Sequence, residues 1–382
     1  MSPRDAAAPD VQGPAGSERL TARIVGELGA FRDAWDALVE AQPLPSPFLR
    51  SWWLDHTAGP HPLFVLVLAE SALVGGLALE RDRRWGVTRL RVQGAGALCP
   101  DHFDLIAAPG WEAAVTGRIA AWLGAGGARV IDLEGVAAHA RITSALPPPA
   151  REEVVDIAPW GRPGSTAAEW FAQLPAGARK TVRTASRRLA AAGVVHRIIT
   201  DSDEAAATLE ALRRLHAERW GHRSRFLRCF GRFSSAALAG MGRGELVLHE
   251  LASPERVVGV LACFEVAGRA SLYQWGRDPD PAWGGLGPVL LTRAFERSCE
   301  LGFREVDLLR GSEPYKQRFA PSIRPVVRLR AAHGLVGWSV LVLLLLQARA
   351  RRLAGRAARW VRTAGAGRDA GRARASSTNR EL

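Results

Sequence analysis

The stretch "GFREVDLLRGSEPYKQRF", residues 302–319, decides how the second half of this chain is interpreted. Its beginning repeats an earlier stretch, because "GARVIDL" at 127–133 and "GFREVDL" at 302–308 share the pattern G-x-R-x-(I/V)-D-L. A second short identity, V-G-x-L-A, occurs at 74–78 and again at 258–262. The two matches occur in the same order in both halves, which predicts two copies of one α/β unit.

The residues around these matches predict the same series of elements twice. In each half we expect a strand, a helix, three strands, a second helix and a closing strand. In the first half these elements are expected at 21–25, 28–40, 63–70, 72–80, 87–94, 110–124 and 128–135. In the second half they are expected at 194–200, 203–220, 245–251, 256–266, 270–276, 286–301 and 304–311. The sequence therefore predicts an α/β fold with mixed sheets and two tandem domains.

Composition divides the chain further. Residues 1–19 lack an apolar core, so we expect a disordered leader and not a signal peptide. The domains are expected at 20–145 and 194–330, and the second is expected to be the catalytic one. Between them, 146–193 is interpreted as a proline-rich linker followed by a basic helical arm. Residues 331–382 are expected to form an apolar helix and a basic tail.

The overall composition is that of a soluble globular protein, with 47% apolar and 23% charged residues. The net charge is +13, and much of it lies after residue 330, where ten arginines face two carboxylates. The four cysteines form no CxxC pair, which argues against a zinc site or a disulfide framework and favours the cytoplasm. No signature of a nucleic-acid-binding module is present, and we expect no bound cofactor or metal.

Two features indicate binding of anions. The arm carries Arg179, Lys180, Arg183 and Arg187, and its arginines stack at helical spacing although like charges repel by about 0.2–0.5 kcal/mol per pair. Such a stripe indicates phosphate, carboxylate or acidic lipid, and the alternative is a solvated face. The glycine-rich turn "DPDPAWGGLGPVLL" at 278–291 opens a helix, which suits a pyrophosphate, although a plain tight turn is the alternative.

Four motifs resemble those of a known family. They are Trp35-x-x-Leu38 followed by Phe48 and Trp52, "RKTVRTASRRLAAAG" at 179–193, "LRRLHAERWG" at 212–221, and the stretch 302–319. With the element order, they resemble the GNAT-type acetyltransferase superfamily, in its FemAB-like double-domain branch. The resemblance is greatest to the CelD-like acetyltransferases of cellulose and exopolysaccharide synthesis, and it covers about residues 20–330.

The resemblance implies transfer of an acyl group from acetyl-CoA or another acyl-CoA, as co-substrate, to an amine or hydroxyl of a sugar or cell-envelope precursor. It implies donor contacts at Gly284, Gly285, Gly287 and Trp275. The family's pyrophosphate loop has the pattern Q/R-x-x-G-x-G, and here Ala282 stands at the Q/R position. An aminoacyl-tRNA-dependent transferase and a non-catalytic scaffold in a polysaccharide synthase complex therefore remain as alternatives.

Four residues are candidates for catalysis. Lys316 can hold a phosphate or an oxyanion and Glu313 can act as a base, while the alternative is an ion pair between them at i, i+3. His216 is a candidate base or a half-buried helix residue. Tyr273 is a candidate acid for a thiolate leaving group or a core tyrosine. The remaining substrate contacts are expected from Arg179, Lys180, Arg183, Arg219, Trp220, Asp101 and Asp104.

The uncharged stretch 331–348, "AAHGLVGWSVLVLLLLQA", has three interpretations. It can dock on the second domain as a helix, or lie in the interface of an anionic membrane with the arginines that follow it. It can also span the bilayer, although export of the basic tail would oppose the positive-inside tendency. The chain is thus expected in the cytoplasm, either free or on the inner face of the membrane.

Overall fold

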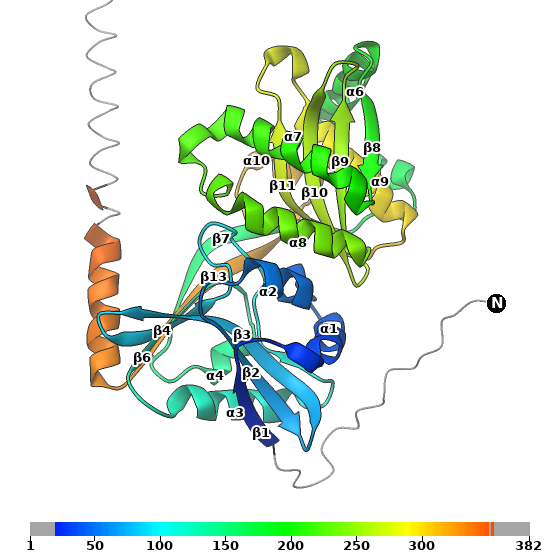
Figure 1. Cartoon of the computed structure of the whole chain (residues 1–382). Helices are drawn as coiled ribbons and strands as arrows, with labels where there is room; N and C mark the ends of the chain where they lie inside the picture. Colours follow the sequence, from blue (N-terminus) through cyan, green and yellow to red (C-terminus); the bar gives the residue numbers. More distant parts are fainter. Residues whose placement is uncertain (1–19, 351–352, 355–382) are drawn as a thin grey trace, which may run out of the picture.

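The computed structural model describes residues 20–350 and 353–354 (Figure 1). The leader expected at 1–19 and most of the basic tail lie outside the described residues. The strands of the first half are β1 (Leu20–Val25), β2 (Pro62–Ala69), β3 (Ala72–Arg84), β4 (Val87–Val92), β5 (Ile106–Ala107), β6 (Arg129–Ala137) and β7 (Arg151–Gly161). Its helices are α1 (Arg32–Glu40), α2 (Ser51–Thr57), α3 (Glu112–Gly124) and α4 (Ile142–Ala145).

The second half is also built of strands and helices. Its strands are β8 (Val195–Ile199), β9 (Leu246–Ala252), β10 (Val257–Val266), β11 (Arg269–Arg277), β12 (Glu305–Asp307) and β13 (Ser322–His333). Its helices are α5 (Ala167–Gln173), α6 (Ala176–Ala191), α7 (Ser202–Trp220), α8 (Phe230–Gly242), α9 (Leu286–Glu300) and α10 (Pro314–Phe319). A further helix, 335–350, follows β13.

One mixed sheet joins the two halves, in the order β1-β2-β3-β4-β6-β13-β7-β12-β11-β10-β9-β8, with β5 paired to β3. The series β1-β2-β3-β4-β6 corresponds to β8-β9-β10-β11-β12, and the last pair is parallel in both. Asp132 on β6 and Asp307 on β12 hold corresponding positions beside β4 and β11. The expected duplication of one α/β unit is therefore confirmed.

The two units exchange a strand. β7 follows the first unit but pairs with β12 of the second, and β13 follows the second unit but pairs with β6 of the first. β7 and β13 also pair with each other. The segment 146–193, expected to begin as a linker, therefore contains a sheet strand, and β13 continues past the expected domain end at residue 330. Local sequence could not show this, because the partners of both strands lie far away along the chain.

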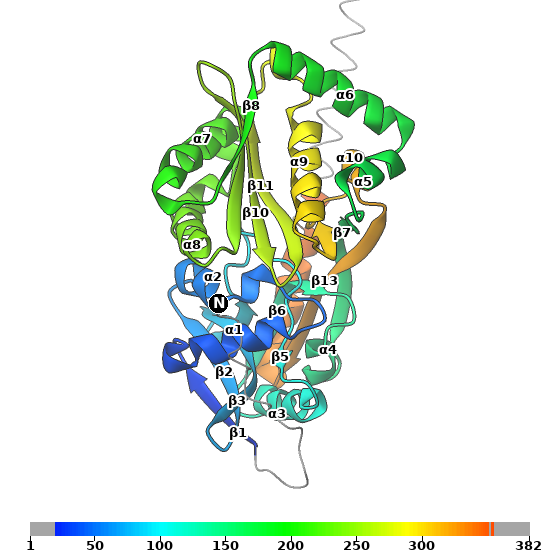
Figure 2. The ribbon, with the colours of Figure 1, turned by 90° about the vertical axis from the view of Figure 1, so that its right-hand side faces the viewer.

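Adjacent glycines in β3 allow helices to pack closely on both faces of the first unit. Successive residues of a strand point to opposite faces. A Cβ on Gly75 would lie 2.6 Å from Val115 of α3, and a Cβ on Gly76 would lie 2.6 Å from Trp35 of α1. In the second unit, α7 and α8 cover one face and α9 with α6 covers the other (Figure 2).

Aromatic side chains connect the units where α2 packs against α8. Phe48 and Trp53 of the first unit contact Phe264 and Tyr273 of the second, with ring centroids 5.4–5.5 Å apart. Edge-to-face pairs of this kind contribute about 0.5–1.5 kcal/mol each beyond the burial of their area. The two units therefore share one apolar core.

The helix 335–350 docks on the first unit and not on the second. Val340 and Leu341 pack against Val87 of β4, Val130 of β6 and Ala332 of β13. Of the three interpretations, the structure shows docking of a helix, but on the first unit instead of the second. Within residues 20–350 and 353–354, no helix has both the length and the apolar character needed to cross a bilayer.

Candidate functional site

A gap opens between β11 and β12. The two strands are paired only over Arg269–Ser271 and Glu305–Asp307, so the β12-facing edge of β11 beyond Ser271 has no strand partner there. β12 ends early because the chain turns at Leu309, which has a positive φ of 52°. Peptide groups along this free edge of β11 are available to a ligand.

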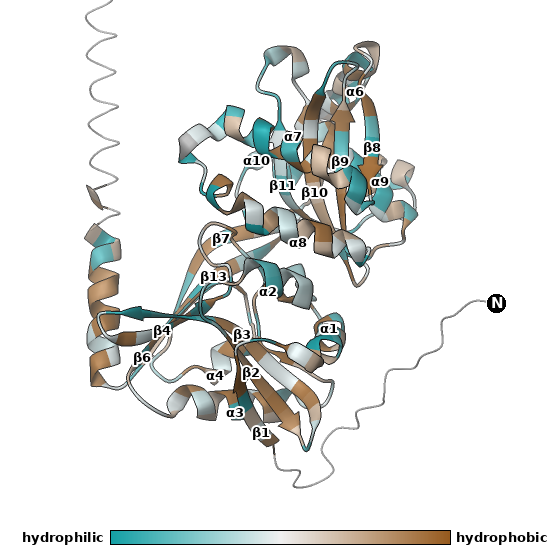
Figure 3. Cartoon of the chain, in the orientation of Figure 1, coloured by the Kyte–Doolittle hydropathy of each residue, from teal (hydrophilic) through white to brown (hydrophobic). Residues whose placement is uncertain are grey.

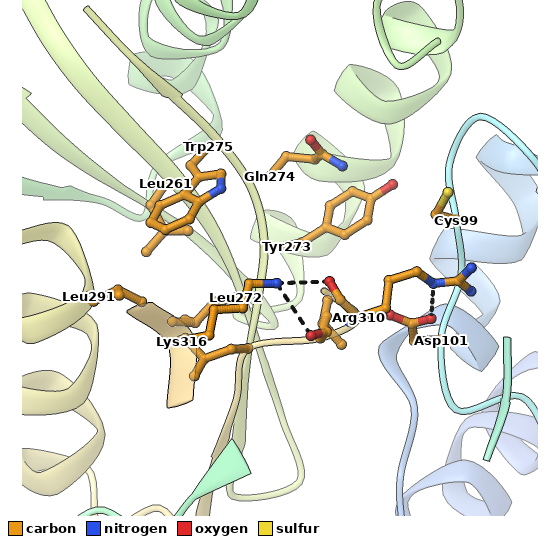
Figure 4. A pocket seen from close by; sticks show the side chains of 12 residues that line it. Cys99, Asp101, Leu261, Leu272, Tyr273, Gln274, Trp275, Leu291, Arg310 and Lys316 are labelled. Carbon is orange, nitrogen blue, oxygen red and sulfur yellow. Dashed lines mark hydrogen bonds and ion pairs between the residues drawn. The ribbon is translucent and has the colours of Figure 1, made fainter. Parts of the chain in front are cut away.

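A cavity of about 90 Å³ lies in this gap (Figure 4). Tyr273, Gln274 and Trp275 of β11 line one side, and Leu309 with Arg310 lines the other. The first unit contributes Cys99 and Asp101 to the same cavity. Both units therefore form the walls of the site.

An ion pair between the units closes one end of the cavity. The Arg310 guanidinium contacts the Asp101 carboxylate, and the backbone N–H of Arg310 donates to the same group at 2.9 Å. Burial raises the pKa of Asp101, and the charge of Arg310 opposes this shift. Asp101, proposed as an acceptor contact, thus lines the cavity but is engaged in holding the two units together.

Lys316 holds the turn that follows β12. Its ammonium donates to the carbonyl oxygens of Arg310 at 2.8 Å and Leu309 at 3.5 Å, and it lies 3.4 Å from the Glu313 carboxylate. The side chain is 9% exposed, whereas that of Glu313 is 54% exposed. The geometry thus shows the ion pair between Lys316 and Glu313 at i, i+3, which was the alternative to a catalytic role. The Lys316 side chain also lines the cavity.

We expect Lys316→Met to destabilise the fold by about 1–3 kcal/mol, because two buried carbonyl groups lose their donor. Urea unfolding measures this loss, and Lys180→Met serves as the control because Lys180 is exposed on α6. A loss of turnover with unchanged stability would instead assign Lys316 a direct role in the reaction.

Tyr273 lies on β11, and His216 lies on α7, which packs against β11. The Tyr273 hydroxyl donates to the carbonyl of Leu98 in the first unit, and burial raises its pKa well above the ordinary value. His216 lies on α7 against the backbone of Trp275, and burial lowers its pKa. Its Nδ1 has no hydrogen-bond partner among the described residues. At neutral pH both groups are therefore uncharged.

The glycine-rich turn begins α9 beside the free end of β11. Gly285 has φ +87°, and a Cβ there would lie 2.5 Å from Ala185 of α6. A Cβ on Gly287 would lie 3.8 Å from Trp275 and 3.7 Å from Arg277. The structure thus brings the predicted donor contacts together, with Gly284 hydrogen-bonded through its carbonyl to Arg188. The first N–H groups of α9 have no partner within the helix, which favours an anion.

Two arginines at this turn add positive charge. The guanidinium of Arg277 forms no ion pair or hydrogen bond with any residue that the structure describes, and it is exposed. Burial and the neighbouring charge of Arg277 lower the pKa of Arg219 on α7. Arg219 also stacks on Trp220, 5.0 Å from the ring centroid. Glu313 acts on Arg219 in the opposite direction and raises its pKa. The helix N-terminus and the two arginines together form a site suited to phosphate groups.

The other proposed substrate contacts lie outside the cavity. Arg179 donates to the Ala172 carbonyl at 2.8 Å and so caps α5, and Arg183 stacks on Phe171. Lys180 is exposed on the same arm. Asp104 accepts from the backbone N–H groups of Ile142 and Arg141, at 2.9 and 3.0 Å, and so caps α4.

Sequence reasoning missed three residues of the site region. Arg277 could have been found, since it stands between a strand and the glycine-rich turn. Arg310 stood within the motif at 302–319, but its partner Asp101 is distant in sequence. His102, which contacts Asp307 at 2.8 Å, carried no signal at all.

Known proteins share parts of these features. Residues 176–317 match the acetyltransferase (GNAT) domain family. No curated protein matches the chain. FemX has 8% identity and a TM-score of 0.58, with 78% of this chain and 95% of that chain covered. A conserved protein of unknown function from Bacteroides thetaiotaomicron has 10% identity and a TM-score of 0.54, over 81% and 99%.

A third similar structure is the C-terminal domain of a putative lysylphosphatidylglycerol synthetase from Agrobacterium fabrum. It has 11% identity and a TM-score of 0.52, over 82% of this chain and 95% of that chain. At such identities the likeness concerns the fold alone. Residues 176–317, which match the GNAT acetyltransferase domain family, include the gap, the glycine-rich turn and most of the motif at 302–319, and the chain shares the fold of FemX.

Proposed function

We propose that the second unit transfers a short acyl group from a coenzyme A thioester to an amine or hydroxyl. One observation carries the proposal: the free edge of β11 leads from the cavity to the anion site at the start of α9. A coenzyme A thioester has matching parts in the same order, namely an acyl group, an extended amide-containing arm and a pyrophosphate. Trp275 contacts both regions and so connects them.

Each part of the donor has a partner in this arrangement. The pyrophosphate binds the N–H groups at the start of α9, with Arg277 and Arg219 beside it. The amide-containing arm lies along the β11 edge beyond Ser271 and hydrogen-bonds to its peptide groups. The cavity of about 90 Å³ is small beside ordinary ligand pockets of roughly 300–1,000 Å³, which supports an acetyl-sized group.

The chemistry then needs positioning and proton transfer. The acceptor attacks the thioester carbonyl, and a peptide N–H of the β11 edge stabilises the resulting oxyanion. Glu313, exposed and 3.4 Å from the Lys316 ammonium on the cavity wall, takes the proton of the acceptor. Tyr273 stays protonated because burial raises its pKa, and its hydroxyl can turn from the Leu98 carbonyl to donate to the departing thiolate. We propose a sugar or cell-envelope precursor as acceptor, as the resemblance to exopolysaccharide acetyltransferases suggests.

Arg277→Ala tests the donor site. We expect the KM for acetyl-CoA to rise about tenfold to a hundredfold, since a charge-assisted phosphate contact contributes about 1.5–3 kcal/mol. Release of free thiol in the presence of an amino sugar measures the rate. Arg293→Ala is the matched control, because Arg293 is an exposed arginine further along α9 that pairs with Glu296. Equal KM values for the two variants would contradict the proposal.

The exposed side of α6 favours a second candidate, an aminoacyl-tRNA-dependent transferase. Four basic side chains are exposed there: Lys180, Arg183, Arg187 and Arg188. α6 contains no Asp or Glu, so no carboxylate of the helix itself balances their charge. Binding of tRNA with a steep salt dependence would favour this candidate. Unchanged acetyl-CoA turnover on addition of tRNA, with no tRNA binding, would exclude it.

A further inference from the structure

The helix 335–350 is apolar on two opposite sides. Its inner side packs on the first unit through Val340 and Leu341, which are 5% and 1% exposed. Contact is close at Gly337, where a Cβ would lie 2.6 Å from the carbonyl oxygen of Arg129. The inner side is therefore occupied by the protein itself.

The outer side of the helix is apolar but faces away from the protein. Leu335 is 89% exposed, and the residues that follow it on the same side at helical spacing are about half exposed: Val342 49%, Leu343 49% and Leu346 54%. Leu353 continues this side beyond residue 350 and is 65% exposed. Hydrophobic bands run along this helix in Figure 3. Contiguous exposed apolar surface of this kind marks an interaction site.

Basic and aromatic side chains border this helix. Arg83 and Arg84 at the tip of the β3–β4 hairpin line the same hollow as Leu341 and Leu344. Trp85 at that tip is 47% exposed, and the Arg84 guanidinium stacks on its ring at 4.7 Å. A tryptophan next to arginines is typical of the boundary between lipid headgroups and acyl chains.

Two acidic groups near the helix, Asp82 and Glu153, are engaged with arginines of the sheet, whereas Glu152 is exposed in the hollow that Val342 and Leu346 line. Asp82 lies 3.4 Å from Arg91, and Glu153 lies 2.8 Å from Arg330. Asp82 and Glu153 therefore do not compensate the positive charges of Arg83 and Arg84 at the hairpin tip. From residue 349 onward the sequence adds ten arginines and only two carboxylates. The hairpin tip and the sequence that follows the helix are therefore both basic.

We propose that this side of the first unit binds the surface of an anionic lipid bilayer. The outer leucines and Val342 enter the boundary of the acyl chains, Trp85 lies at the headgroups, and the arginines contact the acidic headgroups. Docking of the inner side holds the helix against the protein and so parallel to the membrane. The enzyme can then act on an acceptor at a membrane surface, a consequence that rests on the proposed acyltransferase function, whereas membrane binding does not.

Sedimentation of the full chain with lipid vesicles tests this inference. We expect binding to phosphatidylglycerol vesicles, little binding to phosphatidylcholine vesicles, and weakening as salt rises. Leu343→Asp with Leu346→Asp should weaken binding about tenfold or more, because two inserting side chains become charged. Val195→Asp with Leu301→Asp is the matched control, because it replaces exposed apolar residues of the second unit by the same charge.

Two results would overturn the inference. One is the absence of binding to phosphatidylglycerol vesicles, or equal binding by the Leu343/Leu346 variant and the parent chain. The other is a lipid-free dimer in sedimentation velocity that this variant dissociates, which would assign the apolar side to a second copy of the chain. Both variants change exposed positions, so unaltered unfolding curves are expected and keep the comparison valid. Turnover of acetyl-CoA in solution should be the same in both.

Discussion

Asp307→Asn is expected to destabilise the folded chain by about 3–5 kcal/mol, the cost of leaving a buried charge without its partner. Asp307 is fully buried and contacts Arg269 of β11, Arg324 of β13 at 3.0 Å and His102 at 2.8 Å. Burial alone would raise the pKa of Asp307, but His102 and the arginines hold it well below its usual range. One carboxylate thus connects both units and the exchanged strand β13.

Asp132→Asn is the matched control, because Asp132 holds the corresponding position on β6. Its partners Arg89, Arg328 and Arg330 are 20%, 25% and 9% exposed, whereas Arg269 beside Asp307 is 2% exposed, so solvent can better compensate for the charge lost at Asp132. We expect a smaller loss, about 1–3 kcal/mol. Guanidinium unfolding of both variants measures the difference, and equal losses would mean that Asp307 has no special role in joining the units.

Gly285→Ala is expected to weaken acetyl-CoA binding by about a hundredfold or more, because the start of α9 must shift when a Cβ meets Ala185 at 2.5 Å. The residue also has a φ of +87°, which an alanine adopts only with strain. Isothermal titration with acetyl-CoA measures the loss.

Gly302→Ala separates the effect of backbone strain from the effect of displacing a helix. Gly302 has a φ of +63° just after α9, but its Cβ would meet nothing within 4 Å. This variant should lose some stability, as glycines at positive φ do, and keep its affinity for acetyl-CoA. If both variants bind acetyl-CoA equally well, the start of α9 is not the pyrophosphate site.

The duplicated α/β fold was predictable because its signals are local. The repeats at 127–133 and 302–308 mark equivalent strands, and glycines 75 and 76 mark close helix packing on both faces of β3. The exchange of β7 and β13 was not predictable from the sequence. β7 begins just after prolines that suggested a linker, and its partner β12 does not begin until Glu305.

The site was predictable only where its residues are close in sequence. The glycines of the turn at 284–287 and Trp275 do come together, because a strand and the following helix bring them side by side. Lys316 was a candidate to hold a phosphate or an oxyanion, yet its ammonium mainly holds the carbonyls of the turn at 309–310. The contribution of Asp101 and Cys99 from the other unit depends on how the two units pack, which no local pattern encodes.

A crystal structure of the chain with acetyl-CoA tests the central claim most directly. We predict the acyl group in the cavity beside Tyr273, the extended arm along β11 beyond Ser271, and the pyrophosphate at the first turn of α9 next to Arg277. Acetyl-CoA bound instead between β4 and β6 of the first unit, or along the outer side of α6, would contradict the assignment of the second unit as the acyltransferase.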